Sequence, residues 1–314
     1  MNELFNWLKD SDLSIQYRLE KDLLKSPQTV LTDIQTKMLE GGWGYELLTY
    51  QKEDGYWEGY YSPKWISTHY TLQTLRCLNY PKTLSIKYAI NRILKEEKCK
   101  DGGISPSRLH NESDCCVNGM FLTIACYYHA NINDLKSMID YLILAQINDG
   151  GFNCSFNRHK VHHSAFNSTL CVIEGLWEYE NQGYDYRIDD VKKLRKEAEE
   201  FLLHHQLYIS DKTNQIIDER YCSTHFPYYW RYDLLRVLEY FVDSNHTYDK
   251  RLENALIWLE SKHKEYRWNV NAHYSGLTYF TMEKAGKQSK MITIRALKVL
   301  HYFNRINIKS IIKK

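Results

Sequence analysis

The phrase Asp-Gly-Tyr-Trp at residues 54–57 recurs along this chain in two near copies, Asp-Gly-Gly-Ile at 101–104 and Asp-Gly-Gly-Phe at 149–152. The first residues of these phrases are separated by 47 and 48 residues. A fixed period of this length is typical of a supersecondary unit, here a helix pair, that stacks on copies of itself. The glycine after each Asp permits positive φ, which closes a tight turn between two helices.

Helical periodicity dominates the rest of the chain, and period-two alternation is scarce. The more apolar helices are expected at 65–78, 117–130, 166–180, 231–242 and 291–303. More charged helices are expected at 12–25, 27–40, 83–98, 134–147, 188–208 and 248–263. Pairs of alternating polarity can close into a ring, with the apolar helices inside, around a central cavity, and the charged helices outside. We therefore predict an all-α fold of the α/α-toroid type.

No linker or shift in composition divides the chain, so a single domain is expected over 1–314. Within it, we expect leading helices over 1–44 and repeated helix pairs over 45–303. The last residues, 304–314, read as a basic, solvated tail.

Charge and cysteine usage exclude several classes of protein. The chain has 41 Lys and Arg against 39 Asp and Glu, a net charge of +2, which argues against nucleic-acid binding. No apolar run is long enough for a transmembrane segment, and the N-terminus does not resemble a signal peptide. The 8 cysteines lack Cys-x-x-Cys spacing. This argues against a disulfide framework or a zinc ribbon, and we expect a cytoplasmic protein with reduced thiols.

With its repeats in view, the chain resembles the terpenoid cyclase and protein prenyltransferase superfamily of α/α toroids. The resemblance covers residues 45–303 and rests on Gln-x-x-Asp-Gly-x-Trp at 51–57 and Gln-x-x-Asp-Gly-Gly-Phe at 146–152, which are similar to the QW-type repeats of squalene–hopene cyclases. Segments 116–120 and 226–233 resemble a bacterial group of short squalene-cyclase-like proteins. The resemblance implies a toroid enzyme that binds a hydrophobic, isoprenoid- or diphosphate-bearing substrate in its cavity.

The first chemistry of this superfamily is cyclisation started by protonating an alkene, which uses an Asp-x-Asp-Asp motif that this chain lacks. The acidic pair Asp189–Asp190 opens a charged helix, where carboxylates interact favourably with the helix dipole. It also lacks the third carboxylate of a metal-binding Asp-Asp-x-x-Asp motif. Protonation-initiated cyclisation is therefore disfavoured.

The second chemistry is prenyl transfer, in which the family holds zinc through an Asp-x-Cys at one inner-helix start and a His on a later helix. Asp114-x-Cys116 matches the first part, whereas Asn167 stands near the expected His and His163 lies about one turn earlier. The resemblance thus implies a zinc site of Asp114, Cys116 and His163 with an open position. Without metal, Cys116 could be a nucleophile with His163 as base. A buried structural cysteine is the alternative.

Cations also stand near the starts of inner helices, where they oppose the helix dipole. Three of them indicate a diphosphate or carboxylate site: Lys64, Arg231 and Lys290. Pairing with acids in the loops is the alternative. Arg236 and Arg295 sit deeper and are expected to pair with Asp233 or other inner-helix polar groups. In the enzyme hypothesis Asp233 serves as acid or base.

Aromatic and polar side chains are expected near the cavity mouth: Trp65, His69, Tyr70, Phe166, Asn167, Trp230, Tyr232 and Tyr274. Aromatic rings suit an isoprenoid chain and can shelter a carbocation, although core packing is the common use of such rings. Two other functions stay open. One is a carbohydrate-active (α/α)6 enzyme using Asp114 and Asp233 as a carboxylate pair; the other is a non-catalytic ligand-binding or scaffold toroid. The sequence indicates a small hydrophobic or anionic substrate and names no protein partner.

Overall fold

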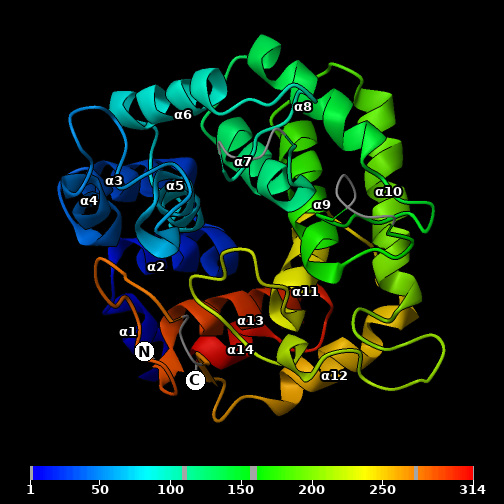
Figure 1. Cartoon of the computed structure of the whole chain (residues 1–314). Coiled ribbons are helices and arrows are strands. Elements are labelled where there is room, and N and C mark those ends of the chain that lie inside the picture. The colour runs from blue at the N-terminus through cyan, green and yellow to red at the C-terminus, as the bar shows by residue number, and fades with distance from the viewer. Residues whose placement is uncertain (1–2, 108–111, 156–160, 272–274, 314) are drawn as a thin grey trace.

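The computed structural model describes residues 3–107, 112–155, 161–271 and 275–313. In this part of the chain the structure is mostly helical (Figure 1). Its sheet is one antiparallel pair of short strands, β1 (Trp268–Asn269) and β2 (Gln288–Ser289). The prediction of an all-α protein is confirmed.

One series of helices is buried along most of its length. Its members are α5 (Thr68–Cys77), α7 (Cys115–Tyr127), α9 (Phe166–Asn181), α11 (Leu234–Asp243) and α13 (Lys290–Tyr302). These are the helices expected to be inner, with ends shifted by a few residues. Neighbours in the series pack together, α5 on α7, α7 on α9, and α11 on α13. Figure 1 shows them succeeding one another around the middle of the molecule.

A second series buries only one face of each helix. It consists of α6 (Leu84–Glu96), α8 (Ile132–Leu144), α10 (Ile188–His204) and α12 (Glu253–Ser261). In Figure 1 these helices lie at the periphery, outside the buried series. The difference in polarity seen in the sequence therefore matches a difference in burial.

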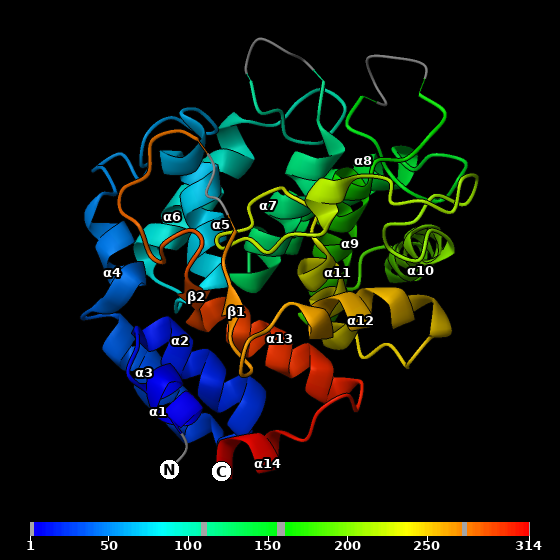
Figure 2. The same ribbon diagram turned by 90° about the horizontal axis from the view of Figure 1, so that it is seen from below.

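The two ends of the chain meet. The N-terminal helices are α1 (Glu3–Lys9), α2 (Leu13–Arg18), which continues as a π-helix over Leu19–Leu24, α3 (Gln28–Met38) and α4 (Gly42–Thr49). Helix α2 packs against α13, and both views place the termini side by side (Figures 1 and 2). The last residues form α14 (Ile308–Lys313), whose Ile308 and Ile311 are buried, instead of a solvated tail. Helices α1, α4 and α14 are not among those expected from the sequence.

The repeated Asp-Gly phrases form equivalent turns. Gly55, Gly102 and Gly150 have φ of 86°, 91° and 92°, the left-handed region that favours glycine. In the first and third turns the side chain of the preceding Gln donates to the glycine carbonyl oxygen, at 2.8 Å in both. The predicted reason for the glycines is therefore confirmed.

Each turn is also tied to the next buried helix by one recurring hydrogen bond. The backbone N–H after the turn donates to a side-chain oxygen near the start of that helix. The pairs are Trp57 to Thr68 (3.1 Å), Ile104 to Asn118 (2.8 Å), Phe152 to Thr169 (3.0 Å) and Trp268 to Thr293 (3.1 Å). The last pair shows that the repeat persists where the Asp-Gly phrase has been lost.

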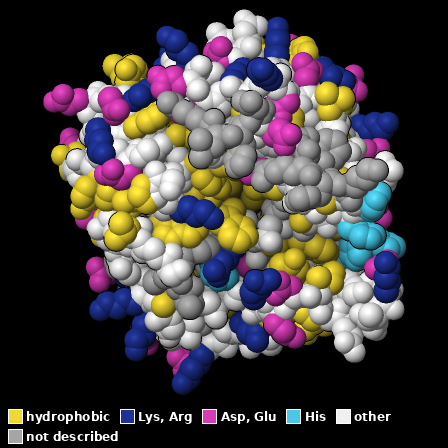
Figure 3. All heavy atoms as spheres, in the orientation of Figure 1, with side chains coloured by type: hydrophobic (Ala, Val, Ile, Leu, Met, Phe, Trp, Pro, Cys, Tyr) yellow, Lys and Arg dark blue, Asp and Glu magenta, His cyan; other side chains and the backbone are white. Residues whose placement is uncertain are grey.

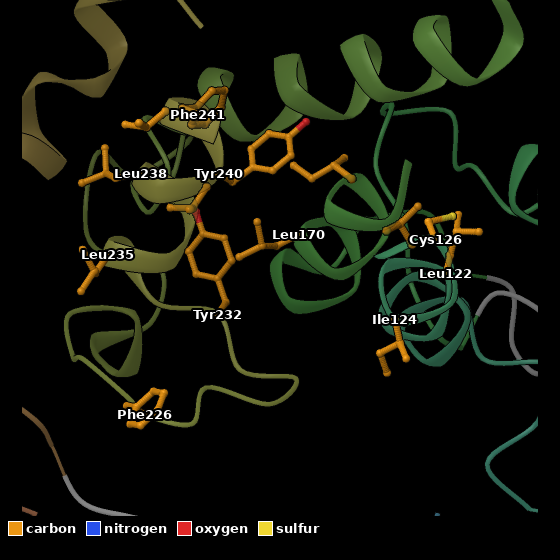
Figure 4. Packing of buried hydrophobic residues seen from close by; sticks show 14 of the residues in the cluster. Leu122, Ile124, Cys126, Leu170, Phe226, Tyr232, Leu235, Leu238, Tyr240 and Phe241 are labelled. Atoms are coloured by element: carbon orange, nitrogen blue, oxygen red, sulfur yellow. The ribbon is translucent and has the colours of Figure 1, made fainter. Parts of the chain in front are cut away.

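Helices α7 and α9 approach most closely, because a glycine stands at each crossing point. A methyl group added to Gly119 would lie 2.4 Å from the carbonyl oxygen of Cys171, and one added to Gly175 would lie 2.5 Å from that of Gly119. Figure 4 shows part of the core that buried side chains of α7, α9 and α11 form around this contact. Short 3-10 turns at Lys64–Ile66, Glu219–Tyr221 and Lys250–Leu252 complete the connections.

Candidate functional site

The segment Phe226–Tyr232, just before α11, is held between two of the buried helices, α5 and α9. Gln73 of α5 donates to the Tyr229 carbonyl oxygen at 2.7 Å. Asn167 of α9 accepts from the Tyr232 N–H at 2.6 Å. Residues of this segment line two chambers. Phe226 and Tyr229 border the first, beside the start of α5, and Tyr228 borders the second, beside the ends of the buried helices.

Tyr228 connects this segment with three of the buried helices. Its hydroxyl accepts from Arg76 of α5 at 3.3 Å. Its ring lies beneath two guanidinium groups, with Arg236 of α11 at 4.3 Å and Arg295 of α13 at 5.0 Å from the ring centre. Cations over an aromatic face are attracted to it, so Tyr228 links three buried helices.

The chamber at the helix starts is apolar and has a volume of about 120 Å³. Its lining includes Trp65, Phe226, Tyr229, Phe280 and Met282. The Trp65 and Tyr229 rings stack at 4.6 Å with 16° between their planes. On the outside, Figure 3 shows hydrophobic side chains gathered around a hollow in this face.

The segment 275–282 forms one wall of the apolar chamber. The Trp65 indole donates to the Ser275 carbonyl oxygen at 2.7 Å, and the Tyr279 hydroxyl donates to the Ile66 carbonyl oxygen at 2.9 Å. Tyr279 also stacks on Tyr50 at 4.3 Å. These contacts hold the C-terminal wall against the start of α5.

Polar groups free to bind a ligand occur at this chamber. The Thr71 hydroxyl lines it and is buried without a hydrogen-bond partner in the described residues. Beside it, the Lys64 ammonium is exposed and lies 5.9 Å from the Trp65 ring centre and 5.8 Å from that of Trp230. No carboxylate of the described residues lies within 4.0 Å of Lys64. The buried Trp230 Nε1 likewise has no partner among them.

The three cations expected to form one anion site have different partners. Arg231 lies 3.1 Å from Nε2 of His225. Lys290 donates to the Asp10 carbonyl oxygen and lies 5.6 Å from the Trp7 ring centre. Lys64 lies over the ring of Trp65, which lines the apolar chamber.

Asp233, the expected acid or base, is fully buried and serves as the N-cap of α11. Its Oδ1 accepts from the Arg236 N–H at 2.8 Å, and its Oδ2 lies 3.3 Å from Nδ1 of His225. Since Arg231 can only donate, His225 Nε2 accepts and Nδ1 carries the proton that binds Asp233. The Asp233 carboxylate thus binds both the start of α11 and the side chain of His225 in the preceding loop. His225 is a partner that the sequence reasoning missed.

Arg236 and Arg295 pair with acids of buried helices, as expected. Arg236 binds Glu174 at 2.6 and 2.8 Å, and Arg295 binds Glu239 at 2.6 Å. Both arginines are nearly inaccessible. Their partners are the glutamates and not Asp233.

The second chamber, of about 400 Å³, is strongly polar. Its charged lining comprises Arg18, Lys21, Lys25, Arg76, Arg236 and Lys298 with Asp22, Glu174, Glu178, Glu239 and Asp243. Lys298 lies 2.5 Å from Asp243, 3.7 Å from Glu239 and 3.9 Å from Asp22. Sequence reasoning missed this chamber, because its members come from five separate stretches of the chain.

The remaining predicted residues lie in the core. His69 is fully buried against Tyr60, Tyr61, Tyr70 and Phe121. Phe166 and Tyr232 pack edge to face at 5.4 Å. Tyr274 lies outside the described residues.

The proposed zinc ligands are not gathered in one place. Asp114 is the N-cap of α7, and Cys116 is half-buried in its first turn. His163 is exposed and lines a different hollow, with Asp149 and His205. Within the described residues no group of three or more His, Cys, Asp or Glu side chains is arranged to hold a metal ion. The geometry gives the zinc hypothesis no support, and it stays a prediction.

Cys116 has sulfur neighbours that the sequence reasoning did not consider. Its N–H donates to Sγ of Cys154 at 3.2 Å, and Cys115 Sγ lies 3.8 Å from the same sulfur. Hydrogen bonds from Cys115, Cys116 and Ser168 hold the pKa of Cys154 well below its ordinary value. The pKa of Cys116 is raised, by its hydrogen bond with Cys154 and by burial. Of the two thiols, Cys154 is therefore the one whose thiolate form is favoured.

No helix in the described part of the chain has the length and hydrophobicity needed to cross a membrane. In comparison with known proteins, no protein family matches this chain, and no curated protein shows significant similarity to it.

Proposed function

We propose that this chain is an α/α toroid that binds a small amphiphile, a short isoprenoid-type group with an anionic end, in the apolar chamber. We further propose that it acts on this substrate as a transferase- or cyclase-like enzyme. The alternation of buried and peripheral helices supports the toroid. The observation that carries the ligand class is an aromatic chamber with the Lys64 ammonium beside it, a cation that has no carboxylate partner within the described residues.

The volume of the chamber limits the apolar part of the ligand. A cavity of about 150 Å³ accommodates benzene, whereas pockets for drug-sized ligands have roughly 300–1,000 Å³. At about 120 Å³, the chamber suits an apolar group of about five or six carbons. A C15 or C30 chain would require the wall at 275–282 to move away.

The polar groups match an anionic end. Lys64 and the Trp230 indole N–H can both donate to a diphosphate or carboxylate, and Thr71 can bond to an oxygen nearer the apolar part. If the carbon–oxygen bond to a diphosphate breaks, the resulting cation faces the rings of Trp65 and Tyr229. Because Asp233 is buried and bonded, we place no protonation of an alkene at this residue.

Two observations favour the non-catalytic alternative, a ligand-binding toroid. Tyr228 is buried in contact with arginines of α5, α11 and α13, where the cavity of a toroid would be expected, and no carboxylate lines the apolar chamber within the described residues. The carbohydrate-active alternative gains no support, because Asp233, one of its two carboxylates, has no exposed surface.

Calorimetric titration with dimethylallyl diphosphate tests the proposal, with farnesyl diphosphate and inorganic diphosphate as comparisons. We expect the short prenyl diphosphate to bind best and Lys64→Met to weaken binding about tenfold, since a charge-assisted hydrogen bond contributes about 1.5 kcal/mol. The exposed Lys87→Met on α6 is the matched control and should bind as the unmodified protein does. Equal binding by both variants, or none by any protein, would overturn the proposed ligand. Release of diphosphate in the same samples separates an enzyme from a binding protein.

A further inference from the structure

Three thiols from two separate segments meet at the start of α7. Cys115 and Cys116 are its first two residues, and Cys154 lies on the loop between α8 and α9. The sulfurs of Cys115 and Cys154 are 3.8 Å apart, in van der Waals contact. The contact joins parts of the chain separated by 39 residues, so helix geometry alone does not require it.

The surroundings of the Cys154 sulfur suit a reactive group. It accepts from the Cys116 backbone N–H at 3.2 Å and lies 3.2 Å from the Ser168 hydroxyl. Both groups, together with the positive end of the thirteen-residue helix α7, stabilise negative charge on the sulfur. Cys154 is half-buried, whereas Cys115 is almost completely buried. Cys154, the more exposed of the two residues, and the almost completely buried Cys115 are thus arranged as an attacking and a resolving thiol.

We propose that Cys154 and Cys115 form a reversible dithiol–disulfide site that reacts with hydroperoxides. The Cys154 thiolate attacks hydrogen peroxide; a sulfur–oxygen bond forms, the oxygen–oxygen bond breaks, and hydroxide leaves as water after taking up a proton. Cys115, losing its proton, then attacks the sulfenic sulfur; the sulfur–sulfur bond forms and a second water leaves. The two thiols lose two electrons, peroxide gains them, and an added dithiol reverses the change.

The geometry requires only a small movement. A disulfide has a sulfur–sulfur distance of about 2.05 Å, so the two sulfurs, now 3.8 Å apart, need to approach by a little under 2 Å. Closing the bond would link the loop before α9 to the first turn of α7.

The test uses the full chain, reduced, treated with a chelator, exposed to hydrogen peroxide and then alkylated. We expect mass spectrometry to find a disulfide between the peptides carrying Cys115 and Cys154, and to find Cys154 oxidised at least about tenfold faster than the half-buried Cys222. A dithiol should restore both thiols. Wild-type protein alone decides this part, so a variant that fails to fold does not obscure the result.

Cysteine variants identify the thiol that pairs with Cys154. Cys154→Ala and Cys115→Ala should lose the cross-link, and Cys115→Ala should leave a sulfenic acid on Cys154 that dimedone traps. Cys116→Ala and Cys222→Ala are the matched controls and should keep the cross-link. A cross-link that persists in Cys115→Ala, or a Cys154 that reacts no faster than Cys222, would overturn the proposal.

Discussion

The buried surroundings of His69 do not suit the place at the cavity mouth that the sequence predicts for it. Both ring nitrogens are buried and have no hydrogen-bond partner within the described residues, and aromatic rings surround the imidazole. Burial lowers the pKa of His69 from 6.5 to about 3, because nothing nearby compensates a positive charge. The ring is therefore a neutral core group and not a ligand to an anion.

A pH-dependent loss of stability follows from this pKa. Between about pH 6.5 and pH 3 the unfolded chain binds a proton at His69 that the folded protein does not, so acid lowers the free energy of unfolding. His69→Leu removes this contribution. Relative to the unmodified protein, we expect the free energy of unfolding of the variant to increase by roughly 1.4 kcal/mol for each pH unit below 6.5, as measured by urea unfolding. The exposed His163→Leu is the control; if both variants show the same pH dependence, His69 does not remain neutral in the fold.

The pairing of α7 with α9 is the element-scale feature most sensitive to side-chain volume. A Cβ on Gly119 would lie 2.4 to 2.6 Å from backbone atoms of Cys171 and Val172, which cannot turn away as a side chain can. Gly119→Ala should therefore separate the helices and lower the free energy of unfolding by about 1–3 kcal/mol, although alanine favours helix formation.

Gly41→Ala is the matched control for this measurement. Gly41 has extended backbone, and an added Cβ would meet no atom within 4 Å. Chemical denaturation of both variants should show a clear loss only for Gly119→Ala. Equal stabilities would mean that α7 and α9 are further apart than described.

Much at the element scale could be predicted from local sequence. The positive φ at Gly55, Gly102 and Gly150 follows from the Asp-Gly phrase, and the inner helices follow from apolar periodicity. The sequence predicts the start of α11 three residues early, because segment 226–232 has the same aromatic character but is not helical. Its conformation depends on contacts with helices far away in sequence, and the periodicity of the sequence does not reveal these contacts.

Only those parts of the candidate site that lie close together in the sequence could be predicted. Lys64 and Trp65 are neighbours in sequence, on the 3-10 turn just before α5, and therefore lie together beside the apolar chamber. The meeting of Cys154 with Cys115, and of Tyr228 with Arg236 and Arg295, requires knowing which helices are neighbours.

At the scale of the whole molecule, buried charges connect the two ends of the chain. Glu239 of α11 binds Arg18 of α2 and Arg295 of α13, with Lys298 3.7 Å away. Burial alone would raise the pKa of Glu239, but these three cations hold it well below its ordinary value. The carboxylate is thus a shared counter-charge, and removing it would leave buried cations uncompensated.

A double-mutant cycle between Arg18→Met and Glu239→Gln measures how strongly this contact couples α2 to α11. Glu239→Gln alone should lower the free energy of unfolding by about 3–5 kcal/mol. The double variant should lose about 1–3 kcal/mol less than the sum of the single variants, because the Arg18 guanidinium, which keeps Asp22 as its other partner, is then no longer buried without Glu239. The exposed pair Lys52–Glu58 gives the control cycle, with a coupling of at most about 1 kcal/mol. Additive losses at Arg18 and Glu239 would show that these residues, 221 positions apart, do not hold the ends together.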